Sequence, residues 1–383
     1  MNRIYLDNAA TTPLGDKARQ EMIRVMDGLY GNPSSIHAEG RIAKTIIENA
    51  RKTVGNTINA SIGEIFFTSC GTESNNMVLN GAVRDLGVKR IISSPVEHHC
   101  ILHTLDFIKD QYGTEIIYLD VNKAAEPQLD QLEELLKTSN VKTLVTLMHA
   151  NNEVGSLSDI HKIGEICKAY HALFHTDTTQ TIGHLEIDVN INNIHFLTGS
   201  AHKFYGPKGV GFVYIQNEHS IKPFIFGGAQ ERNMRAGTEN VIGIAGLAAA
   251  LEDINTHRIE WYNQIALLRA YFKEQLLSCF NDIYFNGDQE DQFFPKILSI
   301  SFPPSTKNEM LLLNLDIAGI SASGGSACSS GVETKSGVLD FIGEPADRKT
   351  VRFSFSHLNT IDEIDYTISK LKGIFPNLLK ETA

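Results

Sequence analysis

Lys203 has the surroundings that most plainly suggest covalent chemistry. It lies in a tight, glycine-bounded turn, TGSAHKFYGPKG at residues 198–209, between two short apolar runs that predict buried strands. Enclosure lowers the pKa of a lysine amine and favours the neutral form that attacks carbonyl groups. Ser200 and His202 flank it with hydrogen-bond donors suited to a phosphate. Although most lysines are solvated surface residues, this combination predicts a Schiff-base lysine for pyridoxal phosphate (PLP).

Two further stretches follow predicted strands and carry groups that suit a phosphate or a flat ring. SCGTESNN, residues 69–76, places Gly71 and Thr72 at a predicted helix start, where free N–H groups and the helix dipole favour an anion. Simple capping by Thr72 explains this pattern about equally well. In PVEHHC, residues 95–100, His98 could stack on a ring or shuttle protons. His99 and His103 have metal-ligand spacing, but no acidic residue recurs with them, so we expect no metal.

Asp177 ends a run that predicts a buried strand. A buried carboxylate needs a charged partner or it becomes protonated. The N–H of a pyridinium ring is such a partner, and Gln180 could then reach the O3 of the ring. The alternative for Asp177 is a cap for the following turn. Asn152, in HANNEVG at residues 149–155, is either a turn residue or a hydrogen-bond donor to a ring hydroxyl or a carboxylate.

Cys328 lies among small residues, SASGGSACSSG at 321–331, that a packed core would not choose. A cysteine on such a loop is exposed and free to reach a substrate. The ordinary interpretation of cysteine as a small buried hydrophobe suits Cys100, Cys167 and Cys279 better. Arg352, which follows in an extended run, could clamp a substrate carboxylate through two hydrogen bonds.

The elements that must position these residues alternate between strand and helix over residues 64–214. Strands are predicted at 65–68, 90–93, 115–118, 143–147 and 173–176, with helices at 73–86, 98–109, 128–137 and 160–170. This alternation predicts an α/β fold with a mostly parallel sheet, in which ligands bind beyond the carboxyl ends of the strands.

The pattern changes after residue 240. A small, apolar run predicts a buried helix over 240–250, and a second, amphipathic helix is predicted over 259–279. Short strands and helices follow. We therefore predict a large domain of residues 14–256 and a smaller α+β domain of residues 1–13 and 257–383.

Composition restricts the partners of the chain. The 383 residues carry a net charge of −11, which argues against direct nucleic-acid binding or an anionic membrane. No stretch is apolar enough to span a bilayer, and the first residues do not form a signal peptide. The five cysteines are odd in number and scattered, which is typical of a cytoplasmic protein.

Nearly the whole chain, from YLDNAATT at residues 5–12 to Arg352 and beyond, resembles the cysteine desulfurases of the class V aminotransferase family. The joint order and spacing of the motifs carry this resemblance. It implies a PLP-dependent transferase of fold type I, with a large domain around a mostly parallel seven-stranded sheet and a smaller α+β domain. The segment around Cys328 is similar to the group with a longer catalytic loop.

The resemblance also implies residue roles. Lys203 would bind PLP covalently, Cys328 would form a persulfide, and His98 would stack on the ring and move protons. The implied cofactor-binding residues are Gly71, Thr72, His98, Asn152, Asp177, Gln180, Ser200, His202, Lys203 and, from the partner subunit, Thr238. Those implied for the substrate carboxylate are Asn32, Asn152 and Arg352.

The implied reaction removes sulfur from L-cysteine, giving L-alanine and a Cys328 persulfide. A homodimer would pass this sulfur to an acceptor such as an iron–sulfur scaffold, where Cys328 transiently shares a cluster, or toward thio-cofactor and tRNA synthesis. Selenocysteine lyase or aminotransferase activity is the second hypothesis. A sulfur carrier or scaffold without catalysis is a third, disfavoured because Lys203, Asp177, His98 and Cys328 are all present.

Overall fold

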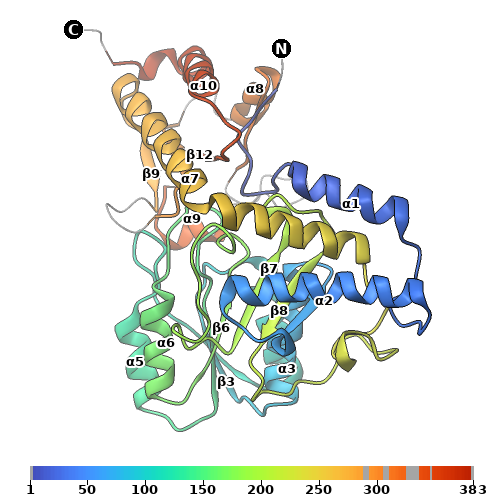
Figure 1. Ribbon diagram of the computed structural model, residues 1–383. Coiled ribbons are helices and arrows are strands. Elements are labelled where there is room, and N and C mark those ends of the chain that lie inside the picture. The colour runs from blue at the N-terminus through green and yellow to red at the C-terminus, as the bar shows by residue number, and fades with distance from the viewer. Residues whose placement is uncertain (1–2, 288–292, 305–309, 325–335, 346, 381–383) are drawn as a thin grey trace.

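The computed structural model describes residues 3–287, 293–304, 310–324, 336–345 and 347–380 (Figure 1). Its centre is a seven-stranded sheet in the order β2-β8-β7-β6-β5-β3-β4. Only β8 runs antiparallel to its neighbours, β2 and β7. The predicted mostly parallel α/β fold is confirmed. The strands are β2 (Ile65–Thr68), β3 (Arg90–Ser93), β4 (Glu115–Tyr118), β5 (Thr143–Thr146), β6 (Leu173–Asp177), β7 (Phe196–Ser200) and β8 (Gly211–Ile215).

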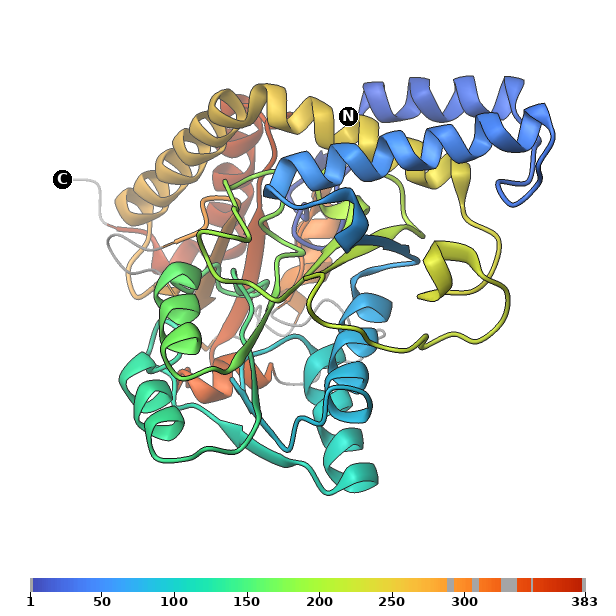
Figure 2. The same ribbon diagram turned by 60° about the horizontal axis from the view of Figure 1, so that its bottom comes forward.

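Helices cover both faces of this sheet, because successive side chains of a strand point to opposite faces. In β3, Ile91 packs with α3 (Gly71–Arg84) and α4 (His99–Tyr112), whereas Ile92 belongs to the core on the other face. That other core is covered by α2 (Ala38–Ile58), α5 (Leu129–Lys137), α6 (Ile160–Ala169) and the first part of α7, with α1 (Asp16–Gly28) packed outside (Figure 2).

The two helices predicted over 240–250 and 259–279 are a single helix, α7 (Val241–Cys279). Its 39 residues span about 58 Å. Buried side chains up to Ile254 join the core of the large sheet, and those from Ile265 onward join a second core. The residues between Ile254 and Ile265 are half-buried or exposed, because the helix there passes from one core to the other. A domain boundary at residue 257 stays a prediction.

The second core lies against a three-stranded antiparallel sheet, β12-β10-β9. The N-terminal segment joins it, because β1 (Ile4–Tyr5) pairs in parallel with β11 (Ile320–Ser321). The N-terminal segment thereby lies with the C-terminal third of the chain, above the large sheet in the view of Figure 1. The remaining elements are β9 (Tyr284–Asn286), β10 (Ile297–Phe302), β12 (Lys349–Ser354), α8 (Leu311–Ile317), α9 (Gly337–Phe341), α10 (Ile361–Ile374) and the 3-10 turns η1 (Ile62–Glu64), η2 (Ala201–Lys203), η3 (Gln230–Asn233) and η5 (Pro376–Leu378).

Within the described ranges, every helix is too short or too polar to cross a lipid bilayer.

Candidate active site

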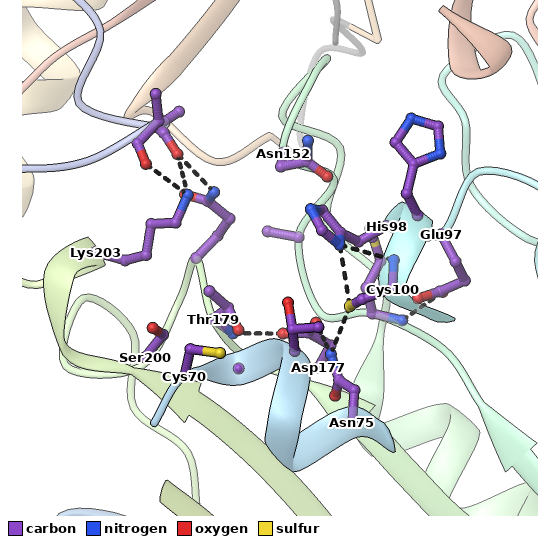
Figure 3. Close-up of a pocket in the computed structure, with 18 of the residues that line it drawn as sticks. Cys70, Asn75, Glu97, His98, Cys100, Asn152, Asp177, Thr179, Ser200 and Lys203 are labelled. Carbon is purple, nitrogen blue, oxygen red and sulfur yellow. Dashed lines mark hydrogen bonds between the residues drawn. The ribbon is translucent and has the colours of Figure 1, made fainter. Parts of the chain in front are cut away.

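A cavity of about 300 Å³ lies where the large sheet, the N-terminal segment and β12 meet (Figure 3). Asp177 and Ser200 enter it from the carboxyl ends of β6 and β7, as expected for a parallel α/β sheet. Most of the residues predicted for the site lie around this one space: Gly71, Thr72, His98, Asn152, Asp177, Gln180, Ser200, His202, Lys203 and Arg352.

One side of the cavity, formed by Gly71, Thr179 and Ser200, is suited to an anion; we call it the phosphate end. The Ser200 Oγ and Thr179 Oγ1 atoms are buried and have no hydrogen-bond partner among the described residues. A Cβ atom on Gly71 would lie 2.9 Å from Thr179 Oγ1, so only glycine leaves this space open. Gly71 is also the first residue of α3, where backbone N–H groups are unpaired. Two orphan hydroxyls beside a helix N-terminus fit the phosphate of PLP.

His202 and Thr72, both predicted phosphate ligands, have other contacts. His202 Nδ1 lies 3.2 Å from Thr11 Oγ1, and burial first, then Lys203, lowers the pKa of His202 to about 4. The ring is therefore a neutral donor at pH 7. The Thr72 side chain hydrogen-bonds Cys100. Thr179, which the sequence analysis did not select, has its hydroxyl directly at the phosphate end.

Asp177 forms the floor of the cavity. Its Oδ2 accepts a hydrogen bond from Asn75 Nδ2 at 2.7 Å, and its Oδ1 accepts from the Thr179 N–H at 2.8 Å. Asn75 is fixed in turn, since its Oδ1 accepts from Thr198 Oγ1 at 2.7 Å. A buried carboxylate held in this way fits the protonated nitrogen of a pyridine ring. Gln180 lines the cavity nearby, with its Nε2 donating to Ala9 O at 3.0 Å.

Lys203 extends from η2 into the cavity (Figure 3). Its Nζ donates to the carbonyl oxygens of Ala9 at 2.6 Å and Ala10 at 2.9 Å, both in the N-terminal segment. Its own carbonyl oxygen accepts from Lys296 Nζ at 2.7 Å. Lys296 is fully buried, and burial, reinforced by Lys203, holds the pKa of the Lys296 amine well below its ordinary value. Through this hydrogen bond, Lys296 holds the turn that contains Lys203. No sequence motif around Lys296 identifies it as a residue of the site.

His98 caps α4 and faces the cavity. Its Nδ1 accepts from the Cys100 N–H at 3.1 Å and lies 3.0 Å from Cys100 Sγ. Burial is the main cause that lowers the pKa of His98 below its ordinary value. Cys100 packs against the core beneath α3 and α4, as expected for a small apolar residue, but it also lines the cavity, because the first turn of α4 directs it back toward His98.

Two carboxyl groups that the sequence analysis missed also line the cavity. Glu97 is fully buried, accepts from the Met148 N–H at 2.7 Å, and has its pKa held well above the ordinary value by burial. Burial likewise raises the pKa of Glu153 to about 7, and the Ser336 hydroxyl donates to it. Glu97 belongs to the motif at residues 95–100 and Glu153 to the motif at residues 149–155, and both motifs follow predicted strands. That position is the signal that could have identified the two carboxyl groups.

The opposite side of the cavity, lined by Asn152, Glu153 and Arg352, with Asp7 bonded to the arginine, is suited to a carboxylate; we call it the carboxylate end. Arg352 Nη1 donates to Asn152 O at 2.7 Å, and Nη2 donates to Asp7 Oδ1 at 3.0 Å. Arg352 is only 1% exposed. The arginine is thus aimed into the cavity from β12 and compensated by Asp7.

Two predicted residues are not brought to the cavity, and a third lies outside the part of the chain that the structure describes. Asn32 is exposed between α1 and α2, and its Oδ1 accepts from the Ser34 N–H at 2.9 Å. Thr238 is exposed on the loop before α7. Cys328 lies outside the described residues. No group of three or more potential metal ligands occurs in the part of the chain that the structure describes.

Comparisons with known proteins identify the family of the chain. The model of the aminotransferase class-V family matches residues 4–367. A cysteine desulfurase IscS of Dictyoglomus turgidum is 40% identical over 379 residues, covering 98% of this chain and 95% of the relative. A putative cysteine desulfurase IscS 1 of Bacillus subtilis is 41% identical, covering 95% and 96%.

Solved structures extend this likeness to three dimensions. A NifS-like protein superimposes with a TM-score of 0.89 at 34% identity, covering 98% of this chain and all of the other. SspA, solved in complex with cysteine, has a TM-score of 0.81 at 30% identity and covers 93% of this chain and all of the other. Family, fold and cavity agree, and the chain belongs to the class V aminotransferase family, among its cysteine desulfurases.

Proposed function

We propose that this cysteine desulfurase binds PLP in the cavity described above and uses it to move sulfur from L-cysteine to Cys328. The observation that carries the proposal is the pair of buried, partnerless hydroxyls of Ser200 and Thr179 beside the N-terminus of α3. Leaving a buried hydroxyl unpaired costs about 1–3 kcal/mol. A phosphate group at this position offsets that cost.

The other cofactor contacts follow from the same placement. Asp177 would hold the pyridine nitrogen in its protonated form, and Lys203 would supply the amine that binds the cofactor. His98, at the N-terminus of α4, would lie over the ring. When bound, PLP supplies the electron sink that makes bonds at the Cα and Cβ atoms of an amino acid labile.

Protons are handled by groups of this chain. Lys203 lies between two backbone carbonyls and can release them to accept the substrate Cα proton. Neutral His98 can hold a proton at Nε2, because Nδ1 accepts from the Cys100 N–H. Arg352 would bind the substrate carboxylate in exchange for part of its contact with Asp7.

The sulfur-accepting role of Cys328 is supported by the residues on either side of its segment. Ser323 exchanges backbone hydrogen bonds with Arg352, and Ser336 donates to Glu153; both partners line the cavity. Only five positions (328 − 323) separate Cys328 from the first anchor. An extended chain of that length spans about 17 Å, so the cysteine is tethered within reach.

In the transfer step, the Cys328 thiolate attacks the substrate sulfur. An S–S bond forms while the Cβ–S bond breaks, and the electron pair of the broken bond stays with carbon, which takes up a proton and leaves as part of L-alanine. Cys328 then carries the persulfide. We propose that an acceptor protein, such as an iron–sulfur scaffold, removes this sulfur.

We also propose a cytoplasmic homodimer. Tyr30, Ile36 and Phe226 are 89%, 91% and 79% exposed, on the two loops that also carry Asn32 and Thr238. Large apolar side chains so exposed are typical of an interface. A partner subunit on these loops would bring Thr238 toward the phosphate end. Free cysteines at positions 70, 100, 167 and 279 suit a reducing compartment.

The test is an absorption spectrum of the purified protein before and after L-cysteine, with alanine and persulfide quantified. We expect a visible cofactor band that cysteine perturbs, with alanine released. Cys328→Ala should keep the band and lose persulfide formation. Full persulfide formation by that variant contradicts the role of Cys328. Selenium release from selenocysteine without Cys328, or a need for a keto acid, would instead indicate the lyase or the aminotransferase.

A further inference from the structure

Cys100 makes a set of contacts that the proposed reaction does not use. Its Sγ lies 3.0 Å from His98 Nδ1 and accepts from Asn75 Nδ2 at 3.2 Å. The Thr72 side chain hydrogen-bonds the same sulfur. Asn75 also donates to Asp177 Oδ2 at 2.7 Å. A continuous chain of hydrogen bonds therefore runs from His98 through the thiol to the carboxylate at the floor of the cavity (Figure 3).

The proton positions in this chain follow from the donors. Asn75 Nδ2 donates to Sγ, so the thiol hydrogen is directed to the other neighbour of the sulfur, His98 Nδ1. Burial, then Asp177, raises the pKa of Cys100 to about 12, which keeps the sulfur protonated. Cys100 is therefore not a second nucleophile. It is a small, adaptable partner of the histidine ring.

We propose that Cys100 is a positioning residue that stabilises the protonated form of His98. This inference rests on the proposed function, in which His98 moves protons. When His98 becomes charged, Nδ1 carries a hydrogen and must donate it. The backbone N–H of Cys100, 3.1 Å from Nδ1, cannot accept a hydrogen bond, whereas Cys100 Sγ at 3.0 Å can.

The direction in which Cys100 shifts the pKa of His98 follows from the hydrogen bonds that the charged and the neutral ring form with the sulfur. A hydrogen bond from a charged imidazolium to sulfur is stronger than one from a thiol to neutral imidazole. Cys100 should therefore raise the pKa of His98 against the lowering effect of burial. The other titratable groups that act on His98 stay in place in all variants below: Asp177 on β6, Lys203 on η2, and His99 and His103 on α4.

The experiment compares Cys100→Val, which keeps the volume and loses the hydrogen bond, with Cys100→Ser, which keeps a hydroxyl acceptor. The His98 ring is titrated by ¹⁵N NMR in the full-length protein, with and without PLP, and His98→Gln assigns the signal. We expect the pKa of His98 to fall by about half to one pH unit in the valine variant and to return in the serine variant. Cys279→Ala, which removes a thiol packed against the second core and outside the cavity lining, should leave the titration unchanged.

The acidic limb of the kcat/KM profile for alanine formation should move with the NMR titration. An unchanged or raised pKa of His98 in Cys100→Val overturns the role of Cys100, even when the wild type releases alanine normally. Absence of alanine from the wild type contradicts the proposed function instead and leaves the NMR comparison valid. If Cys100→Val does not fold, Cys100→Ala takes its place, and an unchanged pKa of His98 in that variant overturns the role of Cys100.

Discussion

The phosphate end and the carboxylate end of the cavity differ in how their polar groups are satisfied. At the phosphate end, the hydroxyls of Thr179 and Ser200 have no partner among the described residues. At the carboxylate end, Arg352 already contacts Asp7 and Asn152, and Glu153 accepts from Ser336. One end is prepared for a group that stays bound, while the other must exchange partners each time a substrate enters and leaves.

This difference follows from the elements that build each end. The phosphate end is built from the last residue of β7, the first residue of α3 and the turn directly after β6. The carboxylate end joins β12, the N-terminal segment and the turn after β5, which come from distant parts of the chain. In the proposed function, binding energy at the first end would hold the cofactor, and binding energy at the second would select the substrate.

The largest effect is expected from Lys203→Ala, which removes the amine between the two ends. The visible band of the lysine-bound cofactor should disappear, and alanine formation should fall by about a thousandfold or more. Absorption spectra and alanine assays check this. Lys208→Ala is the matched control, because Lys208 is exposed in the same turn. An unchanged band in Lys203→Ala contradicts the assignment.

Arg352→Gln should separate the two ends most clearly. Two charge-assisted hydrogen bonds to a carboxylate are worth about 3 kcal/mol, so kcat/KM for L-cysteine should fall about a hundredfold, mainly through KM. Affinity for PLP should not change. Arg348→Gln is the control, since Arg348 precedes the same strand and contacts Asp282 rather than the cavity. Loss of PLP affinity in Arg352→Gln, with KM unchanged, would break the distinction between the ends.

Glu153 gives the carboxylate end a pH dependence. Burial raises its pKa to about 7, above the ordinary 4.5. The folded state therefore binds this proton more tightly than the unfolded state. The resulting stabilisation is complete below pH 4.5 and is lost as the pH rises through 7.

Glu153→Gln stays neutral at every pH. Its free energy of unfolding should exceed that of the wild type by about 1–3 kcal/mol at pH 8, with no such gain at pH 4.5. Urea unfolding of the PLP-free protein at both pH values measures this. A gain of equal size at both pH values shows that charge at Glu153 is not its cause.

The motifs of the phosphate end could be predicted from sequence because each lies directly after a strand of a regular alternation. Asp177 and Ser200 needed only the parallel fold to be placed together. The single helix α7 and the contacts of Lys296 could not be predicted, since they depend on how two cores meet. The place of Cys100 in the cavity wall could not be predicted for a related reason: an apolar pattern indicates burial, but does not distinguish a core from the wall of a cavity.

Ser200→Ala has the smallest expected effect. It tests whether the unpaired Ser200 hydroxyl serves ligand binding or the stability of the fold. Because Ser200 Oγ has no partner among the described residues, its loss should not destabilise the PLP-free protein and should slightly stabilise it. PLP binding, in contrast, should weaken about tenfold, since one hydrogen bond to a charged phosphate is lost. Thermal unfolding of the PLP-free protein and a PLP titration measure the two quantities.

Thr178→Val is the matched control for this variant. Thr178 is as deeply buried, but its Oγ1 donates to Thr198 O at 2.8 Å, so the carbonyl would lose a partner. That substitution should destabilise the protein with and without PLP, by about 1 kcal/mol, and leave the affinity for PLP nearly unchanged. If Ser200→Ala behaves like Thr178→Val, the Ser200 hydroxyl is a structural group, and the phosphate end is no more prepared for a ligand than the carboxylate end.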